Sequence, residues 1–183
     1  RQAPTCLKDT LVKYRDAVDW FIGIMDAEWN AYAECANNQM AVRVSEKLCV
    51  KTAKNESPKY AFSDSFYKFP SYLRRAAIAE AFGLVSSYHS GLDNWNDLPV
   101  SERGRRPSFP KAGFVYPAMY RGNCFVRTGT YSARIKVWTR NTWDWLDVKL
   151  RKGDVDYILR RCSSRKECVP TLRPRGAAGG VCF

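Results

Sequence analysis

The spacing of apolar residues predicts a long amphipathic helix near the N-terminus. Between residues 7 and 32, apolar side chains recur every three or four positions, which places them on one face of a helix. The opposite face carries charges of both signs, mostly acidic, as a solvated surface does. The apolar stripe consists of Leu11, Tyr14, Val18, Phe21, Met25, Trp29 and Tyr32. We expect its aromatic residues to belong to a core and not to a base-stacking platform.

Two further segments in the first half of the chain have helical features. Residues 39–50 show a shorter helical pattern, and strong turn signals follow at residues 55–58. Pro70 and Ser71 indicate the start of another helix, because Pro is tolerated in the first turn and Ser can cap the free amides. We expect this helix to end at Gly91.

Arg74 and Arg75 lie in the first turn of that helix. Cations at a helix N-terminus oppose the helix dipole, which favours a functional use of the pair, such as phosphate binding. A salt bridge to an acid of the long helix, for example Asp19 or Asp26, accounts for the pair equally well. The sequence leaves both interpretations open.

The pattern changes after residue 98. Residues 99–113 interleave prolines and glycines with four cations, a composition that cannot form a helix and predicts an extended basic loop. The four cations are Arg103, Arg105, Arg106 and Lys111.

Beyond the loop, apolar and polar residues alternate with a period of two. The runs at residues 133–138 and 146–150 flank turn residues at 139–142, which predicts an antiparallel hairpin with one apolar and one basic face. A short helix is expected through residues 153–161. A last hairpin is expected to pair residues 171–173 with 181–183.

Together these elements predict an α+β fold, with a helical lobe packed on a small, mostly antiparallel β-barrel or sheet. The expected boundary separates helical residues 1–98 from the basic loop and β domain of residues 99–183. No apolar run approaches the roughly 18 residues of a membrane span, and no signal-peptide pattern opens the chain, so we expect an intracellular protein. The missing initiator Met and the apolar last residues lead us to expect a fragment.

The net charge of +12 is distributed unevenly along the chain. Residues 1–100 contain 12 basic and 12 acidic residues, whereas residues 101–183 contain 18 basic and 6 acidic ones. This asymmetry favours a polyanionic partner for the second half. A basic surface that merely keeps the protein soluble is the alternative.

The sequence contains no recognisable catalytic motif. The seven cysteines include no CxxC pair, which argues against a disulfide framework or a zinc ribbon, so we expect reduced and mostly buried thiols. The single histidine, His89, lacks an accompanying nucleophile motif, and we expect a satisfied or surface imidazole. Phosphate-binding and dinucleotide-binding loops are also missing. We therefore expect no active site in this segment.

Basic residues interleaved with aromatic ones are the remaining candidate chemistry. Cations hold phosphates, while aromatic faces stack on unpaired bases. The residues predicted to bind nucleic acid are Tyr72, Arg74, Arg75, Arg103, Arg105, Arg106, Lys111, Arg121, Arg134 and Lys136.

Several segments resemble the N-terminal region of the TnpB/OrfB family of bacterial insertion sequences, which is related to the compact type V CRISPR effector nucleases. The segments are YKFPSYLRRAAI at residues 67–78, PSFPKAG at 107–113, YRGNCF at 120–125 and PTL at 170–172. The resemblance covers most of residues 7–183. It implies an RNA-guided DNA endonuclease, in which a helical recognition lobe and a wedge-like β-barrel precede a RuvC-like nuclease domain.

The resemblance also implies partners and a location. The partners are guide RNA and target DNA, with no membrane and no small-molecule substrate, in the bacterial cytoplasm at the nucleoid. No cofactor is expected in this segment, because Mg²⁺ and Zn²⁺ belong to the nuclease domain, which is expected downstream. By position, residues 69–75 match the recognition lobe, and residues 103–121 and the hairpin match the wedge. A guided DNA-binding repressor without cleavage and a remnant of a decayed element are the alternatives.

Overall fold

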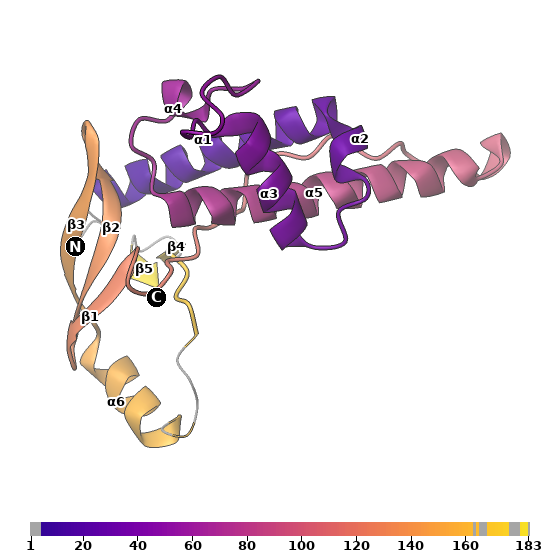
Figure 1. The fold of residues 1–183 in the computed structure, drawn as a ribbon. Helices are drawn as coiled ribbons and strands as arrows, with labels where there is room; N and C mark the ends of the chain where they lie inside the picture. The colour runs from indigo at the N-terminus through magenta and orange to yellow at the C-terminus, as the bar shows by residue number, and fades with distance from the viewer. Residues whose placement is uncertain (1–4, 163, 165–167, 176–179, 183) are drawn as a thin grey trace. The chain divides into compact units, whose positions relative to one another are not determined.

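The computed structural model describes residues 5–162, 164, 168–175 and 180–182 (Figure 1). The chain divides into two compact units, each assembled from separate stretches of sequence. Unit 1 comprises residues 1–14, 68–73 and 116–183, and unit 2 comprises residues 15–67 and 74–115. The boundary expected at residues 98 and 99 falls inside unit 2.

The fold is α+β with an antiparallel sheet, as predicted. Of the two expected forms, the structure has the open one: within the described residues, the three-stranded sheet does not close into a barrel. The described part of the chain contains no helix that is long and apolar enough to cross a membrane.

Unit 2 is helical. Helices α1 (Thr5–Ala27) and α5 (Ser71–Asp97) contribute most of their length to it. The other helices of the unit are α2 (Trp29–Tyr32), α3 (Asn38–Cys49), α4 (Phe62–Ser65) and a 3₁₀ turn, η1 (Val100–Glu102). Asn37 caps α3 by accepting a hydrogen bond from the Met40 amide at 3.1 Å.

The apolar stripe predicted for residues 7–32 forms the core, as expected, but the single predicted helix is wrong, because α1 ends at Ala27 and the last two stripe residues belong to α2. Six of the seven stripe residues are buried, and Trp29 is half-buried. Within unit 2, Phe21, Phe62 and Phe66 stack with ring centroids 4.7 to 5.2 Å apart, and Trp20 meets them edge-on. These contacts bury large aromatic surfaces and give this unit its hydrophobic stabilisation.

The predicted end of α5 at Gly91 is wrong, because the helix continues to Asp97. Gly91 does not adopt a left-handed conformation, and a Cβ added there would lie 3.7 Å from Cγ of Pro107. The indole of Trp95 donates a hydrogen bond to the Gly104 carbonyl at 2.9 Å. Contacts with the following loop therefore accompany the extra turns of the helix.

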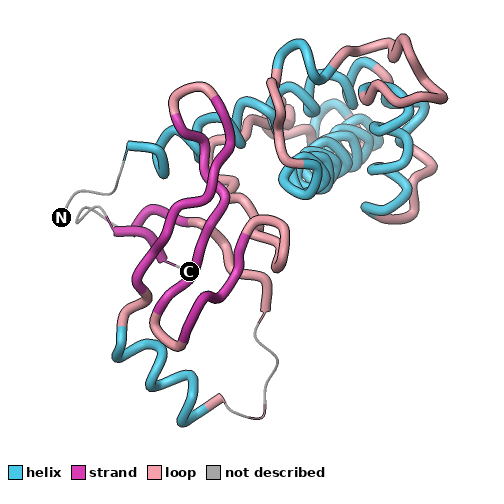
Figure 2. Tube along the Cα trace, turned by 60° about the vertical axis from the view of Figure 1, so that its left-hand side comes forward, coloured by secondary structure: helices cyan, strands magenta, loops and turns pink. Residues whose placement is uncertain are grey.

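The sheet of unit 1 consists of β1 (Phe125–Gly129), β2 (Ser132–Thr139) and β3 (Thr142–Lys149), in that order and antiparallel (Figure 2). The hairpin of β2 and β3 confirms the prediction from the alternating pattern. Its inner face buries Ala133, Ile135 and Val137.

Three further elements complete unit 1. Helix α6 (Lys152–Arg161) follows the sheet as expected. Strands β4 (Arg173–Arg175) and β5 (Gly180–Cys182) pair antiparallel, so a last hairpin forms as predicted, whereas its turn lies outside the described residues. The predicted first strand at residues 171–173 is displaced, because Thr171 forms an isolated bridge with Ala118 and pairing with β5 begins at Arg173.

Candidate nucleic-acid interface

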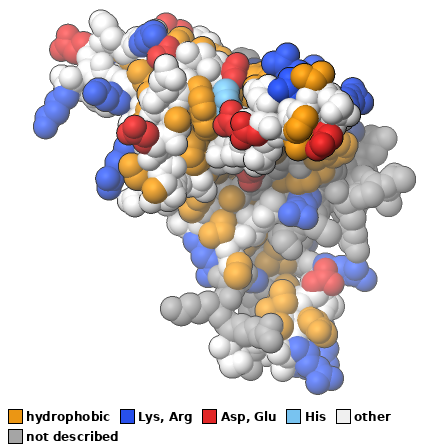
Figure 3. All heavy atoms as spheres, turned by 90° about the vertical axis from the view of Figure 1, so that its right-hand side faces the viewer, with side chains coloured by type: hydrophobic (Ala, Val, Ile, Leu, Met, Phe, Trp, Pro, Cys, Tyr) orange, Lys and Arg blue, Asp and Glu red, His pale blue; other side chains and the backbone are white. Residues whose placement is uncertain are grey.

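The two units differ sharply in charge. Unit 1 contains 18 Lys and Arg against 6 Asp and Glu, and unit 2 contains 12 of each, so the entire net charge of +12 belongs to unit 1. On the face of the molecule shown in Figure 3, basic and acidic side chains are interspersed over the helical part. The fold therefore gathers the excess positive charge on the unit that contains the sheet.

Two predicted cations lie on the outer face of the sheet over one tryptophan. Arg134 and Lys136 alternate along β2 with the buried inner residues, and Lys136 pairs in register with Trp145 of β3. The guanidinium carbon of Arg134 lies 5.7 Å from the Trp145 ring centroid, and Nζ of Lys136 lies 5.1 Å from it. Within the described residues, no carboxylate lies within 4.0 Å of either cation. We call Arg134, Lys136 and Trp145 the basic sheet face.

A third cation of unit 1 lies over another tryptophan. Nζ of Lys13, on α1, lies 5.5 Å from the ring centroid of Trp138. Trp138 meets Trp143 at 5.6 Å, and Trp143 meets Phe69 at 4.9 Å. The sequence pattern identifies neither Lys13 nor Trp145: Lys13 belongs to the helix face that the pattern predicts to be solvated, and Trp145 lies just before the second alternating run.

Tyr72 packs against Tyr120, the residue before Arg121. The rings of Tyr72 and Tyr120, both more than a third exposed, lie 5.6 Å apart, and Arg121 is the next residue. Backbone bonds connect this pair to the sheet, since the Tyr120 carbonyl accepts from the Cys124 amide at 2.7 Å and the Cys124 carbonyl accepts from the Lys136 amide at 2.8 Å.

Arg74 and Arg75 both bind Glu46 of α3 and not an acid of the long helix. Nε of Arg75 donates to Glu46 Oε1 at 2.8 Å, and an Arg74 nitrogen lies 3.5 Å from the same oxygen. The Arg74 side chain is 16% exposed and that of Arg75 is 48% exposed. Burial lowers the pKa of Arg74, against the opposing effect of Glu46. Burial acts to raise the pKa of Glu46, but the two arginines outweigh it and hold that pKa below 4.5.

The predicted loop cations belong to unit 2, whose net charge is zero. One of them binds the end of α5, and the other three are exposed. Arg103 folds back on the end of α5, where it donates to the carbonyls of Leu98 at 2.9 Å and Asn96 at 2.5 Å and lies 4.8 Å from the Trp95 ring centroid. These bonds satisfy carbonyls at the C-terminal end of the helix, one in its last turn and one just after it. The exposed cations of the loop are Arg105, Arg106 and Lys111.

The other candidate chemistry of the sequence is structural. His89 lies 3.0 Å from Asp26 and stacks on Trp29 at 4.1 Å, so the imidazole is satisfied, as expected. The six described cysteines are free, but only Cys49 and Cys124 are buried, so the expectation of mostly buried thiols is wrong. Burial raises the pKa of Cys49 to about 12 and that of Cys124 to about 11. The described residues contain no group of three or more His, Cys, Asp or Glu side chains that could hold a metal ion.

Comparisons with known proteins relate the chain to a protein family. The sequence profile of the Aq_aa04 family matches residues 1–139. The uncharacterized protein aq_aa04 of Aquifex aeolicus (strain VF5) is 34% identical over 80 residues, which is 44% of this chain and 44% of the Aquifex protein. The alignment thus spans less than half of that relative. No solved structure matches the chain.

Proposed function

The chain belongs to the Aq_aa04 family, and we propose that it binds nucleic acid through the sheet-containing unit 1. One observation carries this proposal: the whole net charge of +12 lies in unit 1, where Arg134 and Lys136 are held over Trp145. Neither cation has a carboxylate within ion-pair distance among the residues that the structure describes. Cations that are not held in an internal ion pair are available for phosphate groups.

Aromatic side chains supply the second half of the proposed interaction. Unpaired bases stack on exposed rings, and each stacked base contributes about 1–3 kcal/mol to binding. Tyr72 and Tyr120 are exposed and adjacent to Arg121, within the same unit as the basic sheet face. The arrangement favours single-stranded nucleic acid, which offers both phosphates and unpaired bases.

The resemblance to TnpB/OrfB proteins supports a finer proposal. On this proposal the chain is the nucleic-acid-binding part of an RNA-guided DNA endonuclease of an insertion sequence. Its partners are guide RNA and target DNA, and it acts in the bacterial cytoplasm at the nucleoid. Mg²⁺ and Zn²⁺ then belong to the nuclease domain of that family and not to the residues described here.

The test is the affinity of the chain for single-stranded RNA, single-stranded DNA and duplex DNA of equal length, measured by fluorescence anisotropy over a range of salt concentrations. We expect log K to fall linearly with log salt, with a slope of about −0.7 per phosphate contact on single strands and about −0.9 on duplex DNA. A flat salt response contradicts the proposal.

A pair of tyrosine variants tests the stacking. Tyr72→Leu is expected to weaken single-strand binding about tenfold and to leave duplex binding nearly unchanged, because duplex bases are already stacked. Tyr157→Leu is the matched control, since Tyr157 is also an exposed tyrosine of unit 1 but lies on α6. Equal losses in both variants exclude a specific role for Tyr72.

A further inference from the structure

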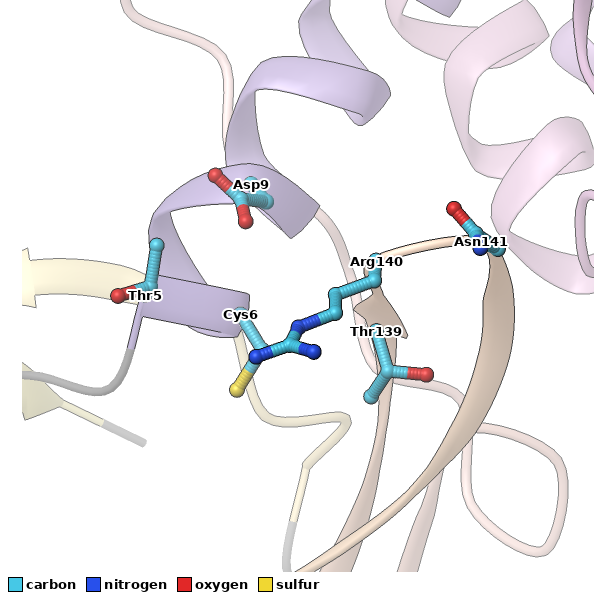
Figure 4. Close-up of a pocket in the computed structure, with 6 residues that line it drawn as sticks. All are labelled: Thr5, Cys6, Asp9, Thr139, Arg140 and Asn141. Atoms are coloured by element: carbon cyan, nitrogen blue, oxygen red, sulfur yellow. The ribbon is translucent and has the colours of Figure 1, made fainter.

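A pocket lies between the first turns of α1 and the turn that joins β2 to β3, within unit 1 (Figure 4). Its volume is about 590 Å³, inside the range of ~300–1,000 Å³ typical of ligand pockets. The lining residues are Thr5, Cys6 and Asp9 of α1 with Thr139, Arg140 and Asn141 of the turn.

Thr10 fixes the two walls of this pocket relative to each other. Its side chain is fully buried, and its hydroxyl donates to the Cys6 carbonyl at 2.6 Å. The same oxygen accepts from the Trp138 amide at 2.8 Å, one residue before the turn. One buried hydroxyl therefore ties the start of α1 to the end of β2, and the pocket walls do not depend on exposed side chains for their spacing.

Asp9 and Arg140 line the pocket from opposite walls without pairing. Within the described residues, neither side chain has a counter-charge within 4.0 Å. Figure 4 shows Arg140 extending from the turn toward Cys6 in the first turn of α1. A carboxylate and a guanidinium that face one space unpaired are complementary to a ligand that offers donors on one edge and acceptors on another.

The carboxylate of Asp9 determines which part of a nucleic acid can enter the pocket. Asp9 repels phosphate, so the pocket suits a base better than the backbone. Guanine offers the donors N1–H and N2–H₂ to a carboxylate and the acceptors O6 and N7 to an arginine, which is the commonest base-specific contact of arginine. The other bases offer a carboxylate a single donor group on their pairing edge. We propose that this pocket binds an unpaired guanine of the bound strand, an inference that rests on the proposed function.

The experiment uses single strands of about eight nucleotides, a length typical of such binding surfaces. The strands are all uridine except for one central position, which is uridine, guanine, adenine or cytosine, and a parallel DNA series uses thymidine. Affinities are measured with the full chain at one salt concentration. The guanine strand is expected to bind about tenfold more tightly than the all-uridine strand, the size of one good bidentate contact.

Two variants remove the proposed contacts without disturbing the turn or the helix. Asp9→Asn removes the negative charge at constant size, and Arg140→Asn removes the guanidinium. Asn suits position 140 because Arg140 has a φ of 40°, and Asn adopts this left-handed region more readily than most residues. Arg161→Gln is the matched control, since it removes one exposed cation of unit 1 on α6, away from the pocket residues.

Each outcome is decisive. Loss of the guanine preference in both pocket variants, with the preference intact in Arg161→Gln, supports the pocket. Equal affinity of the unaltered chain for all four strands overturns the pocket and leaves the proposed function standing, as does a guanine preference that survives both variants. Failure to bind any strand overturns the proposed function and the pocket with it. The RNA and DNA series show which kind of strand supplies the guanine.

Discussion

The two units of this chain differ in net charge and in what their best-defined cations contact. In unit 2 the charges balance, and Arg74 and Arg75 both bind Glu46. In unit 1 basic residues outnumber acidic ones three to one, and Arg134 and Lys136 lie over a tryptophan ring with no carboxylate within 4.0 Å among the described residues. From this comparison we expect that an internal partner, and not the local density of basic residues, separates structural cations from those available to a ligand.

The strongest test of this comparison removes three cations from each unit in turn. Replacing Lys13, Arg134 and Lys136 by Ser is expected to weaken single-stranded RNA binding about 100-fold at low salt and to reduce the salt slope by about 2. The matched variant of unit 2, with Ser at positions 105, 106 and 111, removes the same charge and is expected to cost less than about fivefold. Fluorescence anisotropy across a salt series measures both.

An affinity loss in the unit 2 variant as large as that in the unit 1 variant contradicts the comparison. If the unit 2 variant loses as much affinity as the unit 1 variant, then the basic loop predicted from the sequence is the main contact, and the charge balance of its unit does not prevent binding. Thermal unfolding of both variants confirms that the losses refer to equal folded fractions.

The next effect concerns stability within unit 2. Arg74→Ala is expected to lower the free energy of unfolding by about 2 kcal/mol, because it removes a largely buried side chain that packs 5.9 Å from the Phe62 ring centroid. Arg75→Ala, at a more exposed position, is expected to cost less than about 1 kcal/mol. Arg74→Met keeps the apolar stem without the charge and should lose less than Arg74→Ala. Urea unfolding measures all three. A loss of RNA affinity in Arg74→Ala without a loss of stability favours the phosphate-binding interpretation instead.

The smallest effect is the pH dependence contributed by Glu46. Its pKa in the folded protein lies below the ordinary value of 4.5, so its stabilising contribution is present above about pH 4.5 and is lost as the pH falls through the folded pKa. Glu46→Gln is expected to be about 1 kcal/mol less stable than the unaltered chain at pH 7. This difference should shrink as the pH falls below 4.5. A difference that stays constant in urea unfolding as the pH is lowered excludes the ion pair as its source.

Local patterns predicted most of the elements but not their grouping. Helix α3, the β2–β3 hairpin and α6 have periodicities of their own, and the structure places them as expected. Strand β1 was missed because its five residues, FVRTG, contain only two apolar positions and no alternation. The division into two units could not be predicted from patterns along the sequence, because unit 1 is assembled from three separate stretches of chain.

The candidate site was predictable only where a single strand determines it. The alternation of β2 placed Arg134 and Lys136 on one face without any knowledge of the fold. Trp145 becomes their platform through the cross-strand register, and Glu46 reaches Arg74 across 28 residues of sequence. Such partners depend on tertiary contacts, which charge and spacing along the chain do not encode.

The two buried thiols have a consequence for measuring how the protein opens. Cys124 lies in unit 1 and Cys49 in unit 2, and burial raises both pKa values far above neutrality. A thiol-specific reagent therefore reaches each sulfur only when its own surroundings open, since the reactive thiolate is scarce in the closed state. The labelling rate at Cys124 therefore measures the opening of unit 1, and the rate at Cys49 measures the opening of unit 2. The ratio of the two rates shows whether the units unfold together or one before the other.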